Sequence, residues 1–149
     1  MKVADLMTRE VITVSPNMSV KDAAKLLFSL KISGLPVADE EKRVIGMITE
    51  KDIIGIALPK FVDQVGELAY LLDTEDFARK IAQANKISVR EIMRKEVVCV
   101  TEDTPVPEVA KLMIVKKVRR LPVLKNGKLS GIIARSDIVK EISRRAGLV

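Results

Sequence analysis

The chain has 149 residues, of which 48% are apolar and 3% aromatic, and it carries a net charge of +6. A chain of this length makes one ordinary domain, or two small subdomains that share a core. The lack of tryptophan and the scarcity of other aromatic residues argue against sheet-type readers of single-stranded RNA or DNA, which stack successive bases on aromatic rings.

The apolar runs and the N-terminal residues predict a cytoplasmic protein that does not enter a membrane. No apolar run approaches the roughly 20 residues needed to span a bilayer. The first six residues include an acidic side chain, Asp5, and lack the apolar core of a signal peptide. The single cysteine, Cys99, cannot form an internal disulfide and is expected to be a small buried apolar group rather than a reactive thiol.

The positive charge is concentrated in the C-terminal third. Between Lys111 and Val149 there are eleven Lys and Arg residues and two acidic residues, Asp137 and Glu141, which gives a local net charge of +9. The rest of the chain has 15 basic and 18 acidic residues, a net charge of −3. A basic segment of this kind can attract the phosphates of a nucleotide or a nucleic acid, and it can equally be a solvated surface.

The residue types that most catalytic sites need are missing. With no histidine and a single cysteine, the chain cannot assemble a zinc site, a Ser-His-Asp nucleophile or a Cys-His pair. There is no Gly-x4-Gly-Lys-Ser/Thr phosphate loop, and no run of acidic residues has metal-ligand spacing. We therefore expect a protein that is not an enzyme and has no metal site and no required cofactor.

Two stretches of about fifty residues repeat one another, with an offset of 86 that becomes 85 after a one-residue deletion. Residues 3–7, 10–14 and 35–37 match residues 89–93, 96–100 and 121–123, and residues 46–52 match residues 131–137. The repetition divides the chain into a first repeat at residues 1–58, a helical insert at residues 59–88 and a second repeat at residues 89–149.

Each repeat begins with a predicted strand and helix. Residues 11–14 and 97–100 are short apolar runs typical of strands. A helix follows in each repeat, because apolar residues recur at i, i+3, i+4 and i+7: Val20, Ala23, Ala24 and Leu27 in the first, and Val106, Val109, Ala110 and Met113 in the second. Met18 or Ser19 is expected to cap the first helix, and Thr104 the second, with Pro105 at its first position.

Two more strands and a closing helix complete each repeat. The first repeat has strands at residues 35–38 and 44–49 and a helix at residues 50–58. In the second repeat Asn126-Gly127 predicts a tight hairpin, because both residues tolerate positive φ, and the closing helix covers residues 136–145.

The insert has no counterpart elsewhere in the chain. Its apolar residues between Phe61 and Leu72 have helical spacing, and Asp73 or Thr74 is expected to cap a second helix that ends near Asn85. Each repeat is thus strand, helix, strand, strand, helix, an α+β fold too small to bury a core alone. We expect the repeats to pack about a pseudo-two-fold axis with the insert packed on them, and the insert is also a candidate for a dimer contact.

The most informative stretch is residues 46–53, which returns at residues 131–138. Each copy reads as a glycine, a short apolar strand and a polar turn that opens a helix, with Asp52 or Asp137 in the first turn. The exposed backbone N–H groups at such a helix start suit an anionic ligand. Thr49 and Asp52 also fit a capping box, which is a purely structural explanation. The second copy keeps Asp137 but has Ala134 in place of the threonine, which indicates a role for the aspartate beyond capping.

The ordered set of motifs resembles the CBS motif, named for cystathionine β-synthase, and two in tandem resemble a Bateman module. The resemblance covers about 105 residues, everything but the insert and the C-terminal tail. It rests on Asp5-Leu6-Met7, Leu35-Pro36-Val37 and the Gly46 to Asp52 turn, each with its counterpart in the second repeat. It implies a regulatory module that binds AMP, ADP, ATP or S-adenosylmethionine between its repeats and acts on a protein partner.

The resemblance also implies two clefts, each of which joins the aspartate turn of one repeat to the first strand and the Leu-Pro-Val approach of the other. One cleft would use Thr49 and Asp52 with Val98, Cys99, Val100, Arg119, Arg120, Leu121 and Pro122. The other would use Arg135, Ser136 and Asp137 with Ile12, Thr13, Val14, Ser33, Gly34, Leu35 and Pro36. The aspartate would hold the ribose, the strand residues the adenine, and Thr49 with Arg120 the phosphates.

The two clefts are expected to differ in strength. The first has a threonine and two arginines, whose guanidinium groups match phosphate oxygens, so Asp52 marks the predicted dominant site. Alternatively, Arg119 and Arg120 are a solvated pair at a helix end, where they stabilise the helix dipole. The whole protein is expected to be a homodimer that acts on an unknown protein target. The alternatives are a nucleic-acid-binding protein that uses the basic C-terminal third, and a structural assembly module with empty clefts.

Overall fold

The computed structural model describes residues 1–58 and 74–149 of the chain, and these residues form two compact units. Unit 1 consists of Met1–Ile12, Glu40–Val44 and Val97–Val149, and unit 2 of Thr13–Asp39 and Ile45–Glu96. The units therefore do not follow the chain order of the two sequence repeats, since the chain passes from one unit to the other four times.

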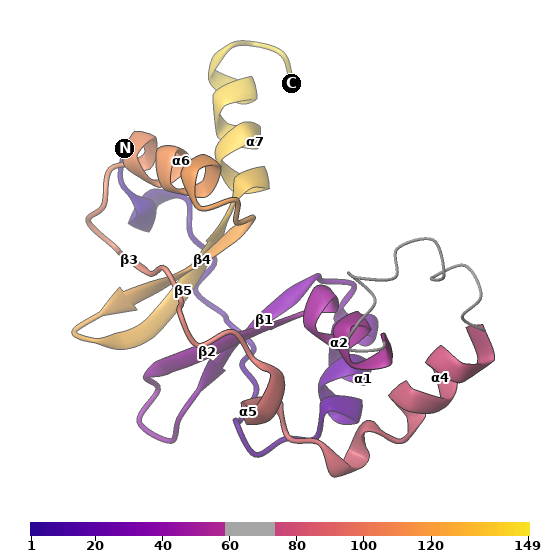
Figure 1. The fold of residues 1–149 in the computed structure, drawn as a ribbon. Coiled ribbons are helices and arrows are strands. Elements are labelled where there is room, and N and C mark those ends of the chain that lie inside the picture. The colour runs from indigo at the N-terminus through magenta and orange to yellow at the C-terminus, as the bar shows by residue number, and fades with distance from the viewer. Residues whose placement is uncertain (59–73) are drawn as a thin grey trace. The chain divides into compact units, whose positions relative to one another are not determined.

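Both units combine helices with a small sheet, as the α+β prediction requires (Figure 1). Unit 2 contains the helices α1 (Val20–Leu30), α2 (Glu50–Ala57), α4 (Thr74–Ala82) and α5 (Val89–Ile92) and the 3₁₀ turn η3 (Ala84–Lys86). It also contains the paired strands β1 (Gly34–Ala38) and β2 (Val44–Thr49), apart from the first residue of β2, which belongs to unit 1. Unit 1 contains the 3₁₀ turn η1 (Val3–Asp5), the helices α6 (Val106–Val115) and α7 (Arg135–Arg145), and a sheet in the order β3 (Val100–Thr101), β4 (Arg120–Lys125) and β5 (Lys128–Ala134).

The predicted helices that fall within the described residues are present, with small differences at their ends. Ser19 is the N-cap of α1, and its hydroxyl accepts a hydrogen bond from the backbone N–H of Asp22 at 3.0 Å. The predicted cap of α6 at Thr104 is wrong, because Pro105 is the N-cap residue. The Thr104 hydroxyl instead accepts a hydrogen bond from the Thr101 N–H at 3.1 Å and holds the turn that precedes the helix.

The predicted strands differ more, and the difference lies in the first strand of each repeat. Only Val14 of residues 11–14 is paired, in a parallel bridge to Val37, and the equivalent pair in unit 1 is Val100 with Val123. Each of these segments pairs with a single neighbouring strand, over one or two residues. The other strands and the hairpin are confirmed, and Asn126 and Gly127 have φ values of 54° and 76°.

The insert is described in part. The predicted helix between Phe61 and Leu72 lies outside the described residues. The second predicted helix is present as α4, and η3 follows it. Ala84 of η3 is fully buried in the core of unit 2, so this end of the insert packs on the first repeat as expected.

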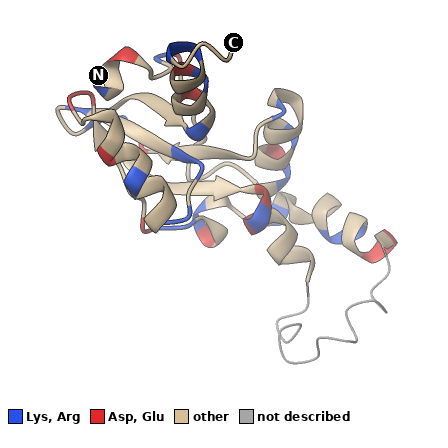
Figure 2. Ribbon diagram, turned by 90° about the horizontal axis from the view of Figure 1, so that it is seen from above, with Lys and Arg blue, Asp and Glu red and all other residues tan. Residues whose placement is uncertain are grey.

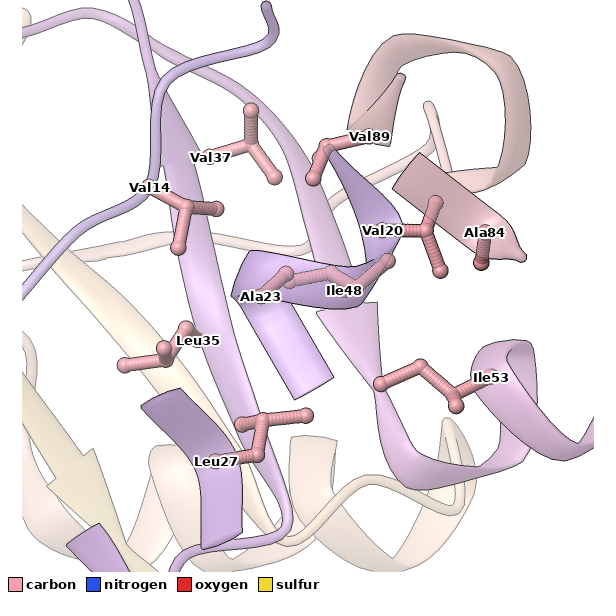
Figure 3. Close-up of a cluster of buried hydrophobic side chains, with 10 residues drawn as sticks. All are labelled: Val14, Val20, Ala23, Leu27, Leu35, Val37, Ile48, Ile53, Ala84 and Val89. Atoms are coloured by element: carbon pink, nitrogen blue, oxygen red, sulfur yellow. The ribbon is translucent and has the colours of Figure 1, made fainter. Parts of the chain in front are cut away.

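The two cores are built from equivalent residues of the two repeats. The core of unit 2 is drawn in Figure 3 and consists of Val14, Val20, Ala23, Leu27, Leu35, Val37, Ile48, Ile53, Ala84 and Val89. The core of unit 1 consists of Val3, Val100, Val106, Val109, Met113, Leu121, Val123, Ile133 and Ile138. All nine core residues of unit 1 have a counterpart in the core of unit 2. Both repeats therefore use the same apolar pattern to cover one face of a small sheet with two helices.

The start of each repeat packs in the unit that holds most of the other repeat. The Val3 N–H donates to the Thr104 carbonyl at 2.9 Å, and Val3 is fully buried in unit 1. In the equivalent contact the Val89 N–H donates to the Met18 carbonyl at 2.8 Å, and Val89 is fully buried in unit 2. The two repeats therefore exchange their first residues.

The exchange continues along the central strands. Thr8 and Ile132 exchange two backbone hydrogen bonds of 2.8 and 2.9 Å in unit 1, and Met47 and Arg94 exchange two of 2.9 Å in unit 2. The glycine next to each strand residue makes this approach possible. A Cβ on Gly131 would lie 2.6 Å from the Met7 methyl carbon and 2.7 Å from the Thr8 carbonyl oxygen, and a Cβ on Gly46 would overlap the Met93 sulfur.

The described ranges 1–58 and 74–149 were also searched for membrane spans and metal sites. None of the helices in these ranges is long and apolar enough to cross a membrane. Within the same ranges no group of three or more His, Cys, Asp or Glu residues is arranged so that it can hold a metal ion.

Candidate functional site

The first candidate group is the turn between β2 and α2 in unit 2. The backbone N–H and the hydroxyl of Thr49 both donate to Oδ2 of Asp52, at 2.9 and 3.0 Å. In return the Asp52 N–H donates to the Thr49 hydroxyl at 3.4 Å. The capping box that the sequence offered as a structural explanation is therefore present, and it holds both side chains half-buried at the start of the helix.

The equivalent turn in unit 1 lies between β5 and α7. Oδ2 of Asp137 accepts a hydrogen bond from the Ala134 backbone N–H at 2.8 Å. A backbone N–H is available whatever the side chain, so the aspartate still caps its helix without a threonine. Retention of Asp137 beside Ala134 is thus explained by capping alone and is no separate sign of a ligand.

Each turn is attached to the residues that precede the Leu-Pro-Val strand of its own repeat. The Glu50 N–H donates to the Ser33 carbonyl at 2.9 Å in unit 2, and the Arg135 N–H donates to the Arg119 carbonyl at 2.9 Å in unit 1. Glu50 was not among the predicted site residues. No sequence signal could have found it, because the contact uses only its backbone N–H.

The side chains at these joins differ between the units in a correlated way. A Cβ on Gly34 would lie 3.1 Å from the Thr49 methyl carbon, so the threonine fills the space beside this position. In unit 1 Arg120 pairs with Ala134 across the β4–β5 ladder. Unit 1 thus combines the small Ala134 with the large Arg120, whereas unit 2 combines Thr49 with Gly34. Unit 2 therefore carries the threonine hydroxyl, and unit 1 carries the guanidinium groups.

The other predicted site residues divide into core and surface. The buried ones are Val14, Val100, Leu35, Pro36, Leu121 and Pro122, the half-buried ones are Val98, Cys99, Ser33 and Arg120, and the exposed ones are Ile12, Thr13, Arg119, Arg135 and Ser136. Burial raises the pKa of the Cys99 thiol, which keeps it protonated and unreactive at neutral pH. Cys99 is thus half-buried rather than fully buried, and its thiol is not activated.

The alternative assignment of the arginine pair to a helix end is wrong. Helix α6 ends at Val115 with Lys116 as its C-cap, and Arg120 is the first residue of β4. The predicted grouping of Thr49 and Asp52 with Arg119 and Arg120 joins residues of different units, and it stays a prediction.

The basic C-terminal third contains acidic partners for some of its cations, and basic and acidic positions both occur along α7 (Figure 2). Arg144 donates to both carboxylate oxygens of Glu141, at 2.7 and 2.9 Å, and Arg145 donates to one of them at 2.8 Å. Part of the positive charge at the end of α7 is therefore neutralised within the helix. Nucleic-acid binding by this segment stays a prediction.

The Glu141 carboxylate is expected to titrate far below an ordinary glutamate. Hydrogen bonds from Arg144 and then Arg145 lower its pKa from 4.5 to about 2. A lowered pKa adds stability above the unfolded value, and this contribution is lost as the pH falls from about 4.5 through about 2. Carboxyl-carbon NMR titration should give the low value, and Glu141→Gln should remove this part of the acid sensitivity of thermal unfolding. A midpoint near 4.5 would contradict the pairing.

The chain is similar to known proteins that share one type of domain. A family model described as "CBS domain" matches residues 3–59 and residues 89–144. The protein MJ1426 of Methanocaldococcus jannaschii is 29% identical, over 95% of this chain and 91% of its own length. A 17.7 kDa protein of Acidianus ambivalens is 32% identical, over 95% of this chain and 73% of its own length. The inosine-5'-monophosphate dehydrogenase of M. jannaschii is 34% identical, but the chain spans only 23% of it.

Solved structures match over nearly the whole chain. The CBS domain pair of protein MJ0100, in complex with 5'-methylthioadenosine and S-adenosyl-L-methionine, is 28% identical with a TM-score of 0.71, over 97% of this chain and 98% of that one. The CBS-pair protein CBSX2 of Arabidopsis thaliana is 28% identical with a TM-score of 0.80, over 98% of this chain and 96% of that one.

Proposed function

Because the chain belongs to the CBS-domain family and carries two CBS domains, we propose that it is a non-catalytic regulatory module that senses an adenosyl ligand. The candidate ligands are AMP, ADP, ATP and S-adenosylmethionine. The observation that carries the proposal is the match of both repeats to the CBS domain. The aspartate at the start of the last helix of each repeat, which accepts a backbone N–H at 2.9 Å in Asp52 and 2.8 Å in Asp137, is the group that we assign to the ribose. The adenosyl ligands of the MJ0100 domain pair support it.

The two carboxylates are suited to ribose. In both turns the hydrogen bonds within the described residues use Oδ2, so Oδ1 is left to accept from a ligand. A ribose presents two neighbouring hydroxyl donors, which a carboxylate can accept together. The capping bonds fix the rotamer of each aspartate before the ligand arrives, which reduces the entropy lost on binding.

The phosphates are assigned to the turn and to the arginine pair. Thr49 and the N–H groups at the start of α2 offer donors to one phosphate group, although the Thr49 hydroxyl must first turn away from Asp52. Arg119 and Arg120 offer planar guanidinium groups that match phosphate oxygens in pairs. We propose that these groups act on one ligand together with residues 98–100 and Leu121-Pro122, which makes Asp52 the dominant site. The second cleft would use Asp137, Arg135 and Ser136 with residues 12–14 and 33–36.

The decisive variant is Asp52→Asn, which keeps an oxygen to cap the helix but removes the negative charge. We expect it to weaken the binding of AMP, ATP or S-adenosylmethionine by on the order of 10- to 100-fold, because hydrogen bonds to a charged group contribute about 1.5–3 kcal/mol. Isothermal titration calorimetry measures this loss, and thermal unfolding checks that the fold is kept.

Asp137→Asn is the matched control, since it makes the same change at the equivalent turn. The proposal predicts a smaller loss of affinity in this variant. If Asp52→Asn binds all three ligands as tightly as the unaltered protein, Asp52 does not hold the ribose. If Asp137→Asn alone loses affinity, the order of the two sites is reversed.

We propose that the module, when it binds its ligand, acts on a protein target. A ligand that binds one conformation better than another can change how the module binds a partner, by no more than its differential affinity for the two. The partner is therefore expected to bind with a different affinity when S-adenosylmethionine or AMP is present.

A further inference from the structure

Two methionines occupy equivalent positions of the two repeats, each against a glycine of a strand. Met7 follows η1 in unit 1, and its counterpart Met93 follows α5 in unit 2. The Met93 sulfur lies so close to Gly46 that a Cβ there would overlap it, and the Met7 methyl carbon lies 2.6 Å from where a Cβ on Gly131 would be. Both glycines are buried, so each thioether is packed against the backbone of a strand.

The same two side chains also contact the apolar cores. Met7 packs against the core of unit 1, and Met93 packs against the core of unit 2. Both are only half-buried, whereas Met113, inside the core of unit 1, is 2% exposed. Methionine commonly fills irregular gaps in cores, and it is also the apolar side chain that oxidants attack most easily. Small oxidants in solution therefore reach Met7 and Met93 more easily than they reach Met113.

The backbone beside each methionine joins the start of one repeat to a strand of the other. In both units the residue after the methionine exchanges two hydrogen bonds with a strand residue, Thr8 with Ile132 of β5 and Arg94 with Met47 of β2. Each pair is an isolated bridge rather than part of a longer ladder. A single bridge has little support of its own, so it depends on the apolar contacts beside it, to which the methionine contributes.

We propose that Met7 and Met93 are sites of reversible oxidation by hydrogen peroxide, and that their sulfoxides release the first residues of each repeat from the strand beside them. In this reaction a lone pair of the sulfur forms a bond to one peroxide oxygen, and the O–O bond breaks. The second oxygen takes the proton of the first and leaves as water, so the sulfur loses the two electrons that the peroxide gains. A dithiol, through a methionine sulfoxide reductase, restores the thioether and yields a disulfide and water.

A sulfoxide is unfavourable where each thioether lies. Its S=O group is a hydrogen-bond acceptor that an apolar core cannot satisfy, so its burial costs free energy. If the side chain turns out into solvent, the oxygen is satisfied, but the glycine and the core beside it lose their cover. We expect the larger effect at Met93, because there the sulfur itself, rather than the methyl carbon, lies nearest the glycine.

Peptide mapping by mass spectrometry after graded peroxide treatment tests the first step. The full chain carries Cys99→Ser, which removes the only thiol. Met7 and Met93 are expected to become sulfoxides at least about tenfold faster than the buried Met113. Met1, which is 45% exposed, shows when the treatment is complete. If Met7 and Met93 stay unmodified when Met1 is fully oxidised, the proposal is overturned.

Thermal unfolding and hydrogen exchange of the oxidised protein test the consequence. The melting temperature is expected to fall by on the order of 5 °C, and the Thr8 and Arg94 amides to gain more in exchange rate than the Val109 amide inside α6. Met7→Leu combined with Met93→Leu keeps the side-chain volume and should remove most of the temperature shift. Unchanged melting after complete oxidation, or an equal shift in the leucine variant, would overturn the proposal.

Met47→Leu is the matched control, because Met47 is also half-buried but lies on the other face of β2 from its neighbour Gly46. Its melting temperature should fall on oxidation as much as that of the Cys99→Ser chain. Met93→Gln, which imitates the polarity of a sulfoxide, should lower the melting temperature without oxidant, and Met47→Gln should lower it less. Protection by Met47→Leu alone would overturn the proposal. These measurements need no ligand, so their failure leaves the ligand proposal intact.

Discussion

Ile133→Ala and Ile48→Ala are each expected to lower the free energy of unfolding by about 2–5 kcal/mol. Both side chains are fully buried, at equivalent positions on β5 and β2, and each belongs to the core of its unit. Their removal loses the transfer free energy of several carbon atoms and leaves a cavity that the surrounding side chains fill only in part.

Urea unfolding followed by circular dichroism measures both losses. Leu148→Ala is the matched control, because Leu148 is 75% exposed, and we expect it to change stability by less than about 0.5 kcal/mol. The chain passes between the units four times, so we expect each core variant to shift one common transition. An unaltered urea midpoint for either isoleucine variant would show that its side chain is not part of a core.

Gly131→Ala is expected to destabilise the protein by about 1–3 kcal/mol or more, and Gly46→Ala by less. The new methyl group on residue 131 would lie 2.7 Å from the Thr8 carbonyl oxygen, and this backbone cannot withdraw without loss of its two hydrogen bonds to Ile132. At Gly46 the main obstacle is the flexible Met93 side chain, and the nearest backbone oxygen, of Arg94, is 3.0 Å away.

Double variants separate these two causes. Met93→Ala should recover much of the stability lost by Gly46→Ala, whereas Met7→Ala should recover little of that lost by Gly131→Ala, because the backbone contact remains. Chemical denaturation of the four variants and the two pairs gives the coupling energies. Equal recovery in both repeats would mean that the side chains alone determine the cost.

Periodicity and capping signals predicted the helices well, since they depend on neighbours in the chain. The i, i+3, i+4, i+7 pattern of α1 and α6 reports burial directly, and Val20, Val109 and Met113 are buried as predicted. The strand predicted at residues 11–14 was wrong, because strand pairing depends on partners distant in the sequence. Of these residues only Val14 is paired, with Val37. Thr104 was wrong as the cap of α6, because Pro105 is the N-cap and the Thr104 hydroxyl accepts the Thr101 N–H instead.

The position of the two aspartates at helix starts was predictable, but their hydrogen bonds were not. Repetition located Asp52 and Asp137 at helix starts, and the structure has both there. The sequence did not reveal that the Ala134 N–H suffices for Asp137 to cap α7, because that bond depends on a backbone group common to all residues. The sequence also gave no sign that Val3 packs in a core with residues of the second repeat, or that Val89 packs in a core with residues of the first. An apolar residue near the start of a repeat gives the same sequence pattern in either case.

The exchanged first residues impose an order on folding during synthesis. Unit 2 needs nothing beyond Glu96, so its core can form while the ribosome is still making the second repeat. Val3 must wait for Thr104, Ile133 and Ile138, whose synthesis follows roughly 5–27 seconds later at the roughly 5–20 residues per second of translation. Residues 1–12 are thus made well before their native neighbours in unit 1, and Val3 stays outside its core until the residues up to Ile138 have been made.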